Sequence, residues 1–158
     1  RDQPRSRGLG DVYKRQLFVH AGLSARLLER NLEMDTLNAR MSEGLYRTSK
    51  ERREDPTLEF LYRSAGPVWY RGMVCTDEKY DPLTPEQTDA LLRRYDADRL
   101  LIGHTIFPDI STFHDGRVIA VNVQNERNRR KNRGRAVLIE GSRISVVGNR
   151  GVKRVLEE

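Results

Sequence analysis

Apolar positions in the first third of the chain predict a buried strand followed by a long helix. The run Leu17-Phe18-Val19 is short and wholly apolar, which is typical of a buried strand. Beyond it, apolar residues recur three, four and seven positions apart, and Ser24 can cap a helix that starts there. This spacing predicts one helix of about five turns with a single buried face. Its apolar positions are Leu23, Leu27, Met34, Leu37, Met41 and Leu45.

The middle of the chain alternates between polar segments and short regular elements. Residues 47–57 are charged and predict a loop, whereas residues 58–62 predict a short helix. Gly66-Pro67 then breaks the chain. A second helix is predicted from Thr84, because Thr84 can cap it, Pro85 suits its first position and Gln87 completes a capping box.

The last third of the chain has the pattern of β-structure. Residues 99–103 predict a strand, and two hairpins follow it. The first hairpin joins residues 110–113 to 118–123 through Asp115-Gly116, a type I′ turn signal. The second joins residues 136–140 to 143–147 through Gly141-Ser142.

Composition narrows the class of protein. The 158 residues suffice for about one domain. Apolar residues make up 37% and charged residues 33%, and mean hydropathy is −0.73. No run approaches the roughly 20 apolar residues of a membrane span, and no signal peptide is visible. The single Cys75 excludes an internal disulfide framework. We therefore expect a soluble protein that resides in either the cytoplasm or the periplasm.

Positive charge is concentrated in two segments. The formal net charge is +6, of which residues 1–16 hold +3 and residues 126–135 hold +5. We interpret the second run as a solvated connection between two strands. The alternative is a nucleic-acid-binding module that uses Arg127 to Arg135 against phosphate backbones. We do not expect nucleic acid as the partner, because a binding domain usually spreads its basic residues over one face.

Both ends of the chain are expected to lie outside the folded domain. Residues 1–16 have no amphipathic period, and their last seven residues (GDVYKRQ) resemble a translated adaptor sequence. We expect this segment to be a disordered or artefactual tail. The domain is predicted to span residues 17–150, and residues 151–158 are predicted to be a second tail.

Two of the three histidines share a context that suits ligand binding. His20 and His104 each follow an apolar strand and have small neighbours, and they are 84 positions apart. Ligand sites gather at the carboxyl ends of strands in α/β folds, and neutral imidazoles bind zinc, iron or manganese. A packed or hydrogen-bonded role is the alternative for each histidine. His114 precedes a turn, is expected to be exposed, and receives no role.

Arg71 is the third candidate. It lies in the segment GPVWYRG, between aromatic residues and a glycine. A planar guanidinium matches a phosphate group with two hydrogen bonds, and Trp69 and Tyr70 could wall the pocket. The alternative is a surface arginine beside a core tryptophan.

The segments LFVHAGLS, GPVWYRG, LIGHT and DGRVIAVNV, in this order, resemble the C-terminal half of calcineurin-like metallophosphoesterases. The branch they resemble most is the bacterial and plant group called Shewanella-like protein phosphatases. The resemblance covers roughly residues 17–148. It departs from the family at Ala21, where the family has a glycine.

The resemblance implies a fold, a reaction and a role for each candidate. The fold is α/β (α+β): part of a metallophosphoesterase β-sandwich flanked by helices, namely the second half, with one of the two sheets. The reaction is hydrolysis of phosphomonoesters on phosphoserine or phosphothreonine, or on phosphotyrosine, with two divalent ions (Mn, Fe or Zn). His20 and His104 would bind the second metal, and Arg71 would hold the substrate phosphate.

Three motifs of the family are missing. Asp-x-His, Gly-Asp-x-x-Asp-Arg-Gly and Gly-Asn-His-Glu supply the first metal's ligands, the bridging aspartate and a histidine acid, and none occurs in this sequence. We therefore expect a fragment of a phosphatase that is inactive as written and has an exposed apolar sheet face. A free-standing regulatory protein that uses the two histidines is the third interpretation. The oligomeric state stays open.

Overall fold

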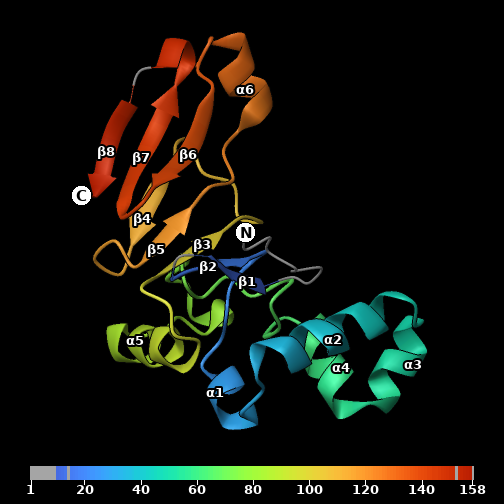
Figure 1. Ribbon diagram of the computed structural model, residues 1–158. Coiled ribbons are helices and arrows are strands. Elements are labelled where there is room, and N and C mark those ends of the chain that lie inside the picture. The colour runs from blue at the N-terminus through green and yellow to red at the C-terminus, as the bar shows by residue number, and fades with distance from the viewer. Residues whose placement is uncertain (1–9, 14, 152, 158) are drawn as a thin grey trace, which may run out of the picture.

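The computed structural model describes residues 10–13, 15–151 and 153–157. In this part of the chain the centre is a mixed five-stranded sheet (Figure 1). The strands β2 and β3 and the strands β3 and β5 pair in parallel, and the two edge strands are antiparallel to their neighbours. In spatial order they are β1 (Gly10–Tyr13), β2 (Gln16–Val19), β3 (Arg99–Ile102), β5 (Val118–Ala120) and β4 (Ser111–Phe113).

A second sheet packs on one face of the first (Figure 1). It consists of β6 (Arg135–Glu140), β7 (Arg143–Gly148) and β8 (Lys153–Glu157), all antiparallel. Ile144 and Val146 on β7 meet Leu101 and Ile119 of the first sheet. The expectation that one sheet is missing and that a sheet face lies exposed is therefore wrong: two layers are present, and the second covers this face.

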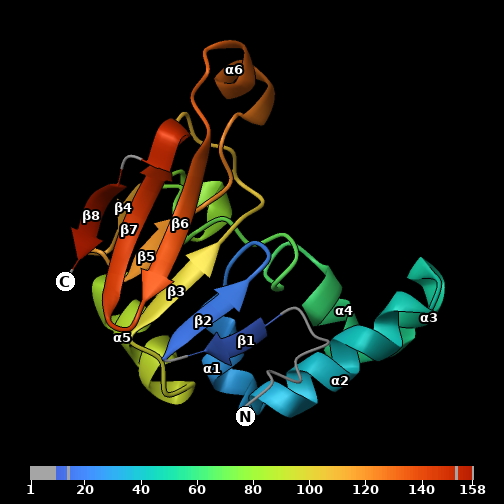
Figure 2. The same cartoon turned by 45° about the horizontal axis from the view of Figure 1, so that its top comes forward.

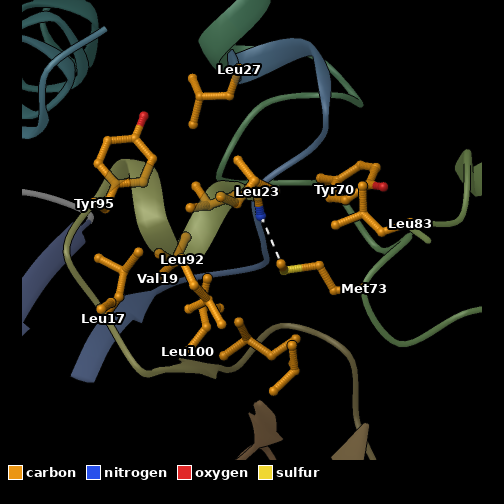
Figure 3. Close-up of a cluster of buried hydrophobic side chains, with 14 of the residues drawn as sticks. Leu17, Val19, Leu23, Leu27, Tyr70, Met73, Leu83, Leu92, Tyr95 and Leu100 are labelled. Carbon is orange, nitrogen blue, oxygen red and sulfur yellow. Dashed lines mark hydrogen bonds between the residues drawn. The ribbon is translucent and has the colours of Figure 1, made fainter. Parts of the chain in front are cut away.

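Helices and loops cover the opposite face of the five-stranded sheet. Strand side chains alternate between the two faces, so Leu100 and Ile102 pack here, whereas Leu101 between them packs against the second sheet. The helices α1 (Arg26–Arg30) and α5 (Pro85–Arg94) contribute Leu27 and Leu92 to this core (Figure 3). The mixed α/β class is thus as predicted.

A group of three helices extends to one side of the sheet (Figure 2). It consists of α2 (Met34–Leu45), α3 (Ser49–Glu54) and α4 (Pro56–Tyr62). Three short elements complete the described chain: η1 (Glu78–Tyr80), α6 (Asn125–Arg130) and η2 (Asn149–Gly151).

The single long helix predicted over residues 23–45 is two helices. Asn31 takes a left-handed conformation with φ 48° and ends α1, and α2 begins three residues later. The apolar spacing continues across the break because both helices bury residues in the same core. The predicted loop over residues 47–57 is also wrong: Thr48 forms a capping box for α3, and Asp55 caps α4 ahead of Pro56.

Both predicted tails differ from the structure. Strand β1 pairs with β2, and Arg15 forms ion pairs with Asp96 and Asp98 at 2.7 and 2.9 Å; residues 1–9 lie outside the described residues. At the other end β8 extends the second sheet. Strand pairing joins main-chain groups, so the composition of an edge strand need not reveal it.

The hairpins are present with one change of turn. The Gly141-Ser142 turn is as predicted, with Glu140 opposite Arg143. The first hairpin closes from Phe113 to Val118, so its loop has four residues rather than two. His114, Asp115 and Gly116 all have positive φ there. The predicted strand 118–123 ends at Ala120 in the sheet.

The basic run 126–135 is partly helical rather than a plain loop. It forms α6, and Arg130 pairs with Glu126 at 2.6 Å while Arg135 pairs with Asp109 at 2.8 Å. Two of its six cations are thus neutralised within the fold. No helix in the described chain is both long enough and apolar enough to span a membrane.

Candidate functional site

The site forms where the parallel strands β2 and β3 end. Val19 lies opposite Ile102 at the last paired position, and His20 and His104 follow close behind. The Gly103 amide donates to the His20 carbonyl oxygen at 2.9 Å. A Cβ at Gly103 would lie 3.3 Å from that oxygen, so a glycine permits this close approach. The prediction that the two strand ends converge is therefore correct.

Two contacts of backbone amides just after β2 hold the loop of Arg71 in place. The Ala21 amide donates to the Pro67 carbonyl oxygen at 2.9 Å. The Leu23 amide lies 3.4 Å from the Met73 sulfur (Figure 3). These contacts clamp residues 67–73 on both sides of Arg71, which brings a residue 51 positions from His20 to the same place.

His20, His104 and Arg71 form a continuous chain of hydrogen bonds. His20 Nε2 lies 3.2 Å from His104 Nδ1, and Arg71 Nη2 lies 3.1 Å from His104 Nε2. The Trp69 ring meets the His104 ring edge-on with centroids 5.2 Å apart. His20 is exposed, and His104 and Arg71 are half-buried. All three predicted site residues are therefore brought together.

Burial and Arg71 together act on the protonation of His104. A guanidinium only donates, so His104 Nε2 accepts its hydrogen bond, and the proton of the neutral ring sits on Nδ1, facing His20. Burial lowers the pKa of His104, and the positive charges of Arg71 and His20 lower it further. The His104 ring is thus kept neutral with its proton on Nδ1, so a metal ion would bind Nδ1 only after displacing that proton.

The histidine pair fits part of a metal site. Two nitrogens bound to one zinc ion at about 2.0–2.1 Å lie roughly 3.0–3.4 Å apart when the angle at the metal is about 95–110°. The 3.2 Å between His20 Nε2 and His104 Nδ1 falls in this range. The described residues contain no group of three or more His, Cys, Asp or Glu residues that could hold a metal. The spacing of the pair therefore fits two ligands of a set of three or four, and the described residues alone do not complete such a set.

Asn122 supports His104 and was not found from the sequence. His104 has φ 54°, a left-handed conformation that costs a non-glycine residue about 1–3 kcal/mol. The Asn122 side-chain amide donates to the His104 carbonyl oxygen at 3.2 Å. Its only signal in the sequence is a polar residue between Val121 and Val123, just beyond β5.

The aromatic residues beside Arg71 have different places. Trp69 is 53% exposed, so it is not a core tryptophan, whereas Tyr70 is 2% exposed. The Tyr70 hydroxyl donates to the Asp81 carbonyl oxygen at 2.5 Å, and burial raises the pKa of Tyr70. Trp69 and Arg71 line a cavity of about 700 Å³, together with Arg26, Arg63 and Lys79, three cations that the sequence did not single out.

His114 lies in other contacts. Its Nε2 is 3.0 Å from the Met73 carbonyl oxygen, and its Nδ1 is 3.3 Å from the Thr88 hydroxyl. It is half-buried, so the expected exposure of this residue is wrong. These bonds give it a structural role between α5 and the Arg71 loop.

The chain is similar in structure to solved proteins that are named protein tyrosine phosphatases. The chain is similar to a cold-active protein tyrosine phosphatase, with 26% identity, a TM-score of 0.80, and coverage of 91% of this chain and 40% of that one. It is likewise similar to the cold-active protein-tyrosine phosphatase of a psychrophilic Shewanella species, with 25% identity, a TM-score of 0.79, and coverage of 90% and 41%. The chain thus spans about 40% of the length of these proteins. No family model matches the sequence, and no curated protein is significantly similar to it.

Proposed function

We propose that this chain is the C-terminal portion of a metal-dependent phosphomonoesterase and carries part of its active site. The observation that carries the proposal is the chain Arg71–His104–His20 at the carboxyl ends of β2 and β3. The likeness to solved phosphatases over nine tenths of the chain supports the reaction class.

Each residue has a chemical task in this proposal. His20 and His104 hold one of two divalent ions, which when bound supply charge neutralisation and an activated water for attack on phosphorus. Arg71 binds two phosphate oxygens and neutralises charge that grows on them in the transition state. Trp69 shields one side of His104 from water. Asn122 keeps the His104 main chain in its left-handed conformation.

We expect no appreciable phosphatase activity from the 158 residues alone. Two neutral ligands cannot offset two divalent ions, and the described residues supply no third ligand to join them. The test is hydrolysis of p-nitrophenyl phosphate with added manganese, iron or zinc. Metal-dependent turnover that is lost in His104→Ala would show that the chain holds a complete site, and the proposal of a partial one would be wrong.

The ligand assignment is tested by metal content. In a protein that joins this chain to the N-terminal portion of a related phosphatase, His20→Ala or His104→Ala should lower bound metal. His114→Gln is the matched control, because this histidine bonds to Met73 and Thr88 instead. Full metal occupancy and activity in His20→Ala would leave a likeness of fold only.

Arg71 is tested separately from the metal. Arg71→Ala should keep the metal content of the joined protein and weaken inhibition by phosphate and vanadate. The loss should be about 10-fold or more, because a charge-assisted bond contributes about 1.5–3 kcal/mol. Unchanged vanadate inhibition would remove Arg71 from the phosphate site.

The class of phosphomonoester is part of the proposal. We propose phosphoserine and phosphothreonine in proteins as the substrates, with phosphotyrosine as the competitor; the solved neighbours are named tyrosine phosphatases. Relative kcat/KM of the joined protein on three peptides that differ only in the phosphorylated residue separates them. A preference of more than tenfold for phosphotyrosine would overturn the serine/threonine assignment.

A further inference from the structure

The cavity beside Arg71 is large enough to hold a side chain of a bound peptide. Its volume of about 700 Å³ lies within the roughly 300–1,000 Å³ of ligand pockets. Its lining comes from separate segments of the chain: Arg26 at the start of α1, Arg63 just after α4, the Trp69–Arg71 loop, and Lys79 on η1. Arg71 lines this cavity and also contacts His104, so the cavity adjoins the histidine pair.

The lining is strongly positive. Arg26, Arg63, Arg71 and Lys79 are its cations, and Asp81 is the one acidic residue among the described residues that line it. Lys79 is paired with Asp77 at 2.8 Å, and Arg63 lies 3.6 Å from Glu59. Arg26 and Arg71 form no ion pair within the described chain.

Aromatic rings form much of the remaining wall. Trp69, Tyr62 and Tyr80 all line the cavity, and Trp69 is more than half exposed. Apolar walls lower the local dielectric and strengthen the attraction between a cation and a bound anion. The cavity therefore combines two uncompensated arginines with walls that suit the apolar stems of peptide side chains.

We propose that this cavity binds an acidic side chain next to the phosphorylated residue, so that the site selects acidic phosphopeptides. The inference rests on the proposed function, in which Arg71 holds the phosphate group. Arg26 is then the principal partner of the neighbouring carboxylate, and Arg63 assists it. A carboxylate on a peptide side chain meets the two arginines that lack an ion pair within the described chain, Arg26 and Arg71, while its apolar stem lies against the aromatic wall.

The chain contains its own reporter for the test. Trp69 is the only tryptophan and lies between the cavity and His104. Quenching or a shift of its fluorescence therefore reports binding to the 158-residue chain without a label. The probe is a peptide with a non-hydrolysable phosphonate analogue of phosphoserine flanked by aspartates. Its partner peptide has asparagines in place of the aspartates.

We expect the aspartate peptide to bind more tightly than the asparagine peptide, by about 10-fold at low salt and less at high salt. Arg26→Gln should lower the affinity for the aspartate peptide by about 2- to 5-fold, as for an exposed ion pair, and leave the asparagine peptide unchanged. Arg26→Gln combined with Arg63→Gln should remove most of the preference. Arg129→Gln on α6 is the matched control for net charge and should change neither affinity.

Three results would overturn the inference. The first is equal affinity for the two peptides. The second is a preference that survives the double substitution, and the third is a preference that falls as much in Arg129→Gln. The proposed function fails in a different way. In that case Arg71→Gln would leave the binding of both peptides unchanged, and peptides with and without the phosphonate would bind alike.

Discussion

At the scale of the residue, Arg71 acts on His104 through a bond and through its charge. Its guanidinium donates to His104 Nε2, and its positive charge is the second cause, after burial, of the lowered pKa of His104. His20 adds a third, smaller effect. The neutral ring at the centre of the site thus depends on the residue that is proposed to bind phosphate.

Replacing Arg71 should change the titration of His104 in the metal-free protein. In Arg71→Gln we expect the pKa of His104 to rise toward its ordinary value of 6.5 without reaching it, because burial remains. Arg71→Lys keeps the charge and should keep the pKa low. The measurement is the pH dependence of the His104 ring signals by NMR, assigned with His104→Gln. Identical titrations in the Gln and Lys variants would show that the Arg71 charge does not reach the ring.

The same lowered pKa gives stability a definite pH dependence. The folded chain binds the His104 proton less tightly than the unfolded chain does. Stability from this group is therefore present above pH 6.5 and is lost as the pH falls through the lowered pKa of the folded state. His104→Gln should flatten the decline in the free energy of unfolding on the acid side of pH 6.5, as measured by urea titration.

At the scale of the element, two helices begin with the same capping box, but only one of the two was predicted from the sequence. Thr84, Pro85 and Gln87 mark the start of α5 and were recognised. Thr48 and Glu51 form the same box for α3 but lie in a charged run without an apolar face, so the segment was predicted to be a loop. A capping box thus marks a helix even where no buried stripe accompanies it.

The cap of α5 should contribute measurably to stability. Thr84→Ala removes the acceptor of the Gln87 amide and should lower the free energy of unfolding by about 1 kcal/mol. Thr57→Ala is the control, because its side chain makes no capping bond to α4, whose cap is Asp55. The measurement is urea denaturation followed by circular dichroism. Equal losses in the two variants would mean that the effect is not capping.

The composition of residues 1–16 predicted a tail that adds nothing to stability, whereas the pairing of β1 with β2 predicts that this strand stabilises the fold. A chain that starts at Gln16 lacks β1 and the ion pairs of Arg15 with Asp96 and Asp98, and the edge of β2 is left unpaired. We expect its melting temperature to be several degrees below that of a chain starting at Gly10, since a loss of about 1 kcal/mol shifts the midpoint by roughly 2–8 °C. Equal melting temperatures would favour the artefactual tail.

At the scale of the whole molecule, the two sheets share one core. Ile144 on β7 is fully buried against Leu101 and Ile119 of the five-stranded sheet. We therefore expect the second sheet to unfold together with the first, although its strands are all C-terminal to the site. It covers the face of the sheet opposite to the one that packs against α1 and α5.

Removing the central contact between the sheets should destabilise the whole chain. Ile144→Ala leaves a cavity in this core and should cost about 2–5 kcal/mol. Val155→Ala on β8 is the control, because Val155 is 44% exposed and should cost less than about 1 kcal/mol. The unfolding transitions followed by circular dichroism and by tryptophan fluorescence should coincide in both variants. Separate transitions in Ile144→Ala would mean that the second sheet folds independently.

The sequence by itself determined the strands that end at the candidate site and the two hairpins, and it pointed to the three candidate residues that the structure brings together. Apolar runs that end in His20 and His104 predicted buried strands, and the arginine in GPVWYRG stood out from the charged surface residues. Those signals are local, since each depends on a few consecutive residues. The cations of the cavity leave no such signal, because Arg26, Arg63 and Lys79 look like ordinary surface charges along the chain.

Only the tertiary structure decided which distant residues meet. It paired β2 with β3 in parallel, with paired residues 83 positions apart, and packed the second sheet on the first. It also held the Arg71 loop to Ala21 and Leu23 through Pro67 and Met73. It also divided the predicted helix at Asn31, where the spacing of apolar residues continues on both sides. Pairing of main-chain groups and packing between distant elements leave little trace in local composition, so these features had to be seen in three dimensions.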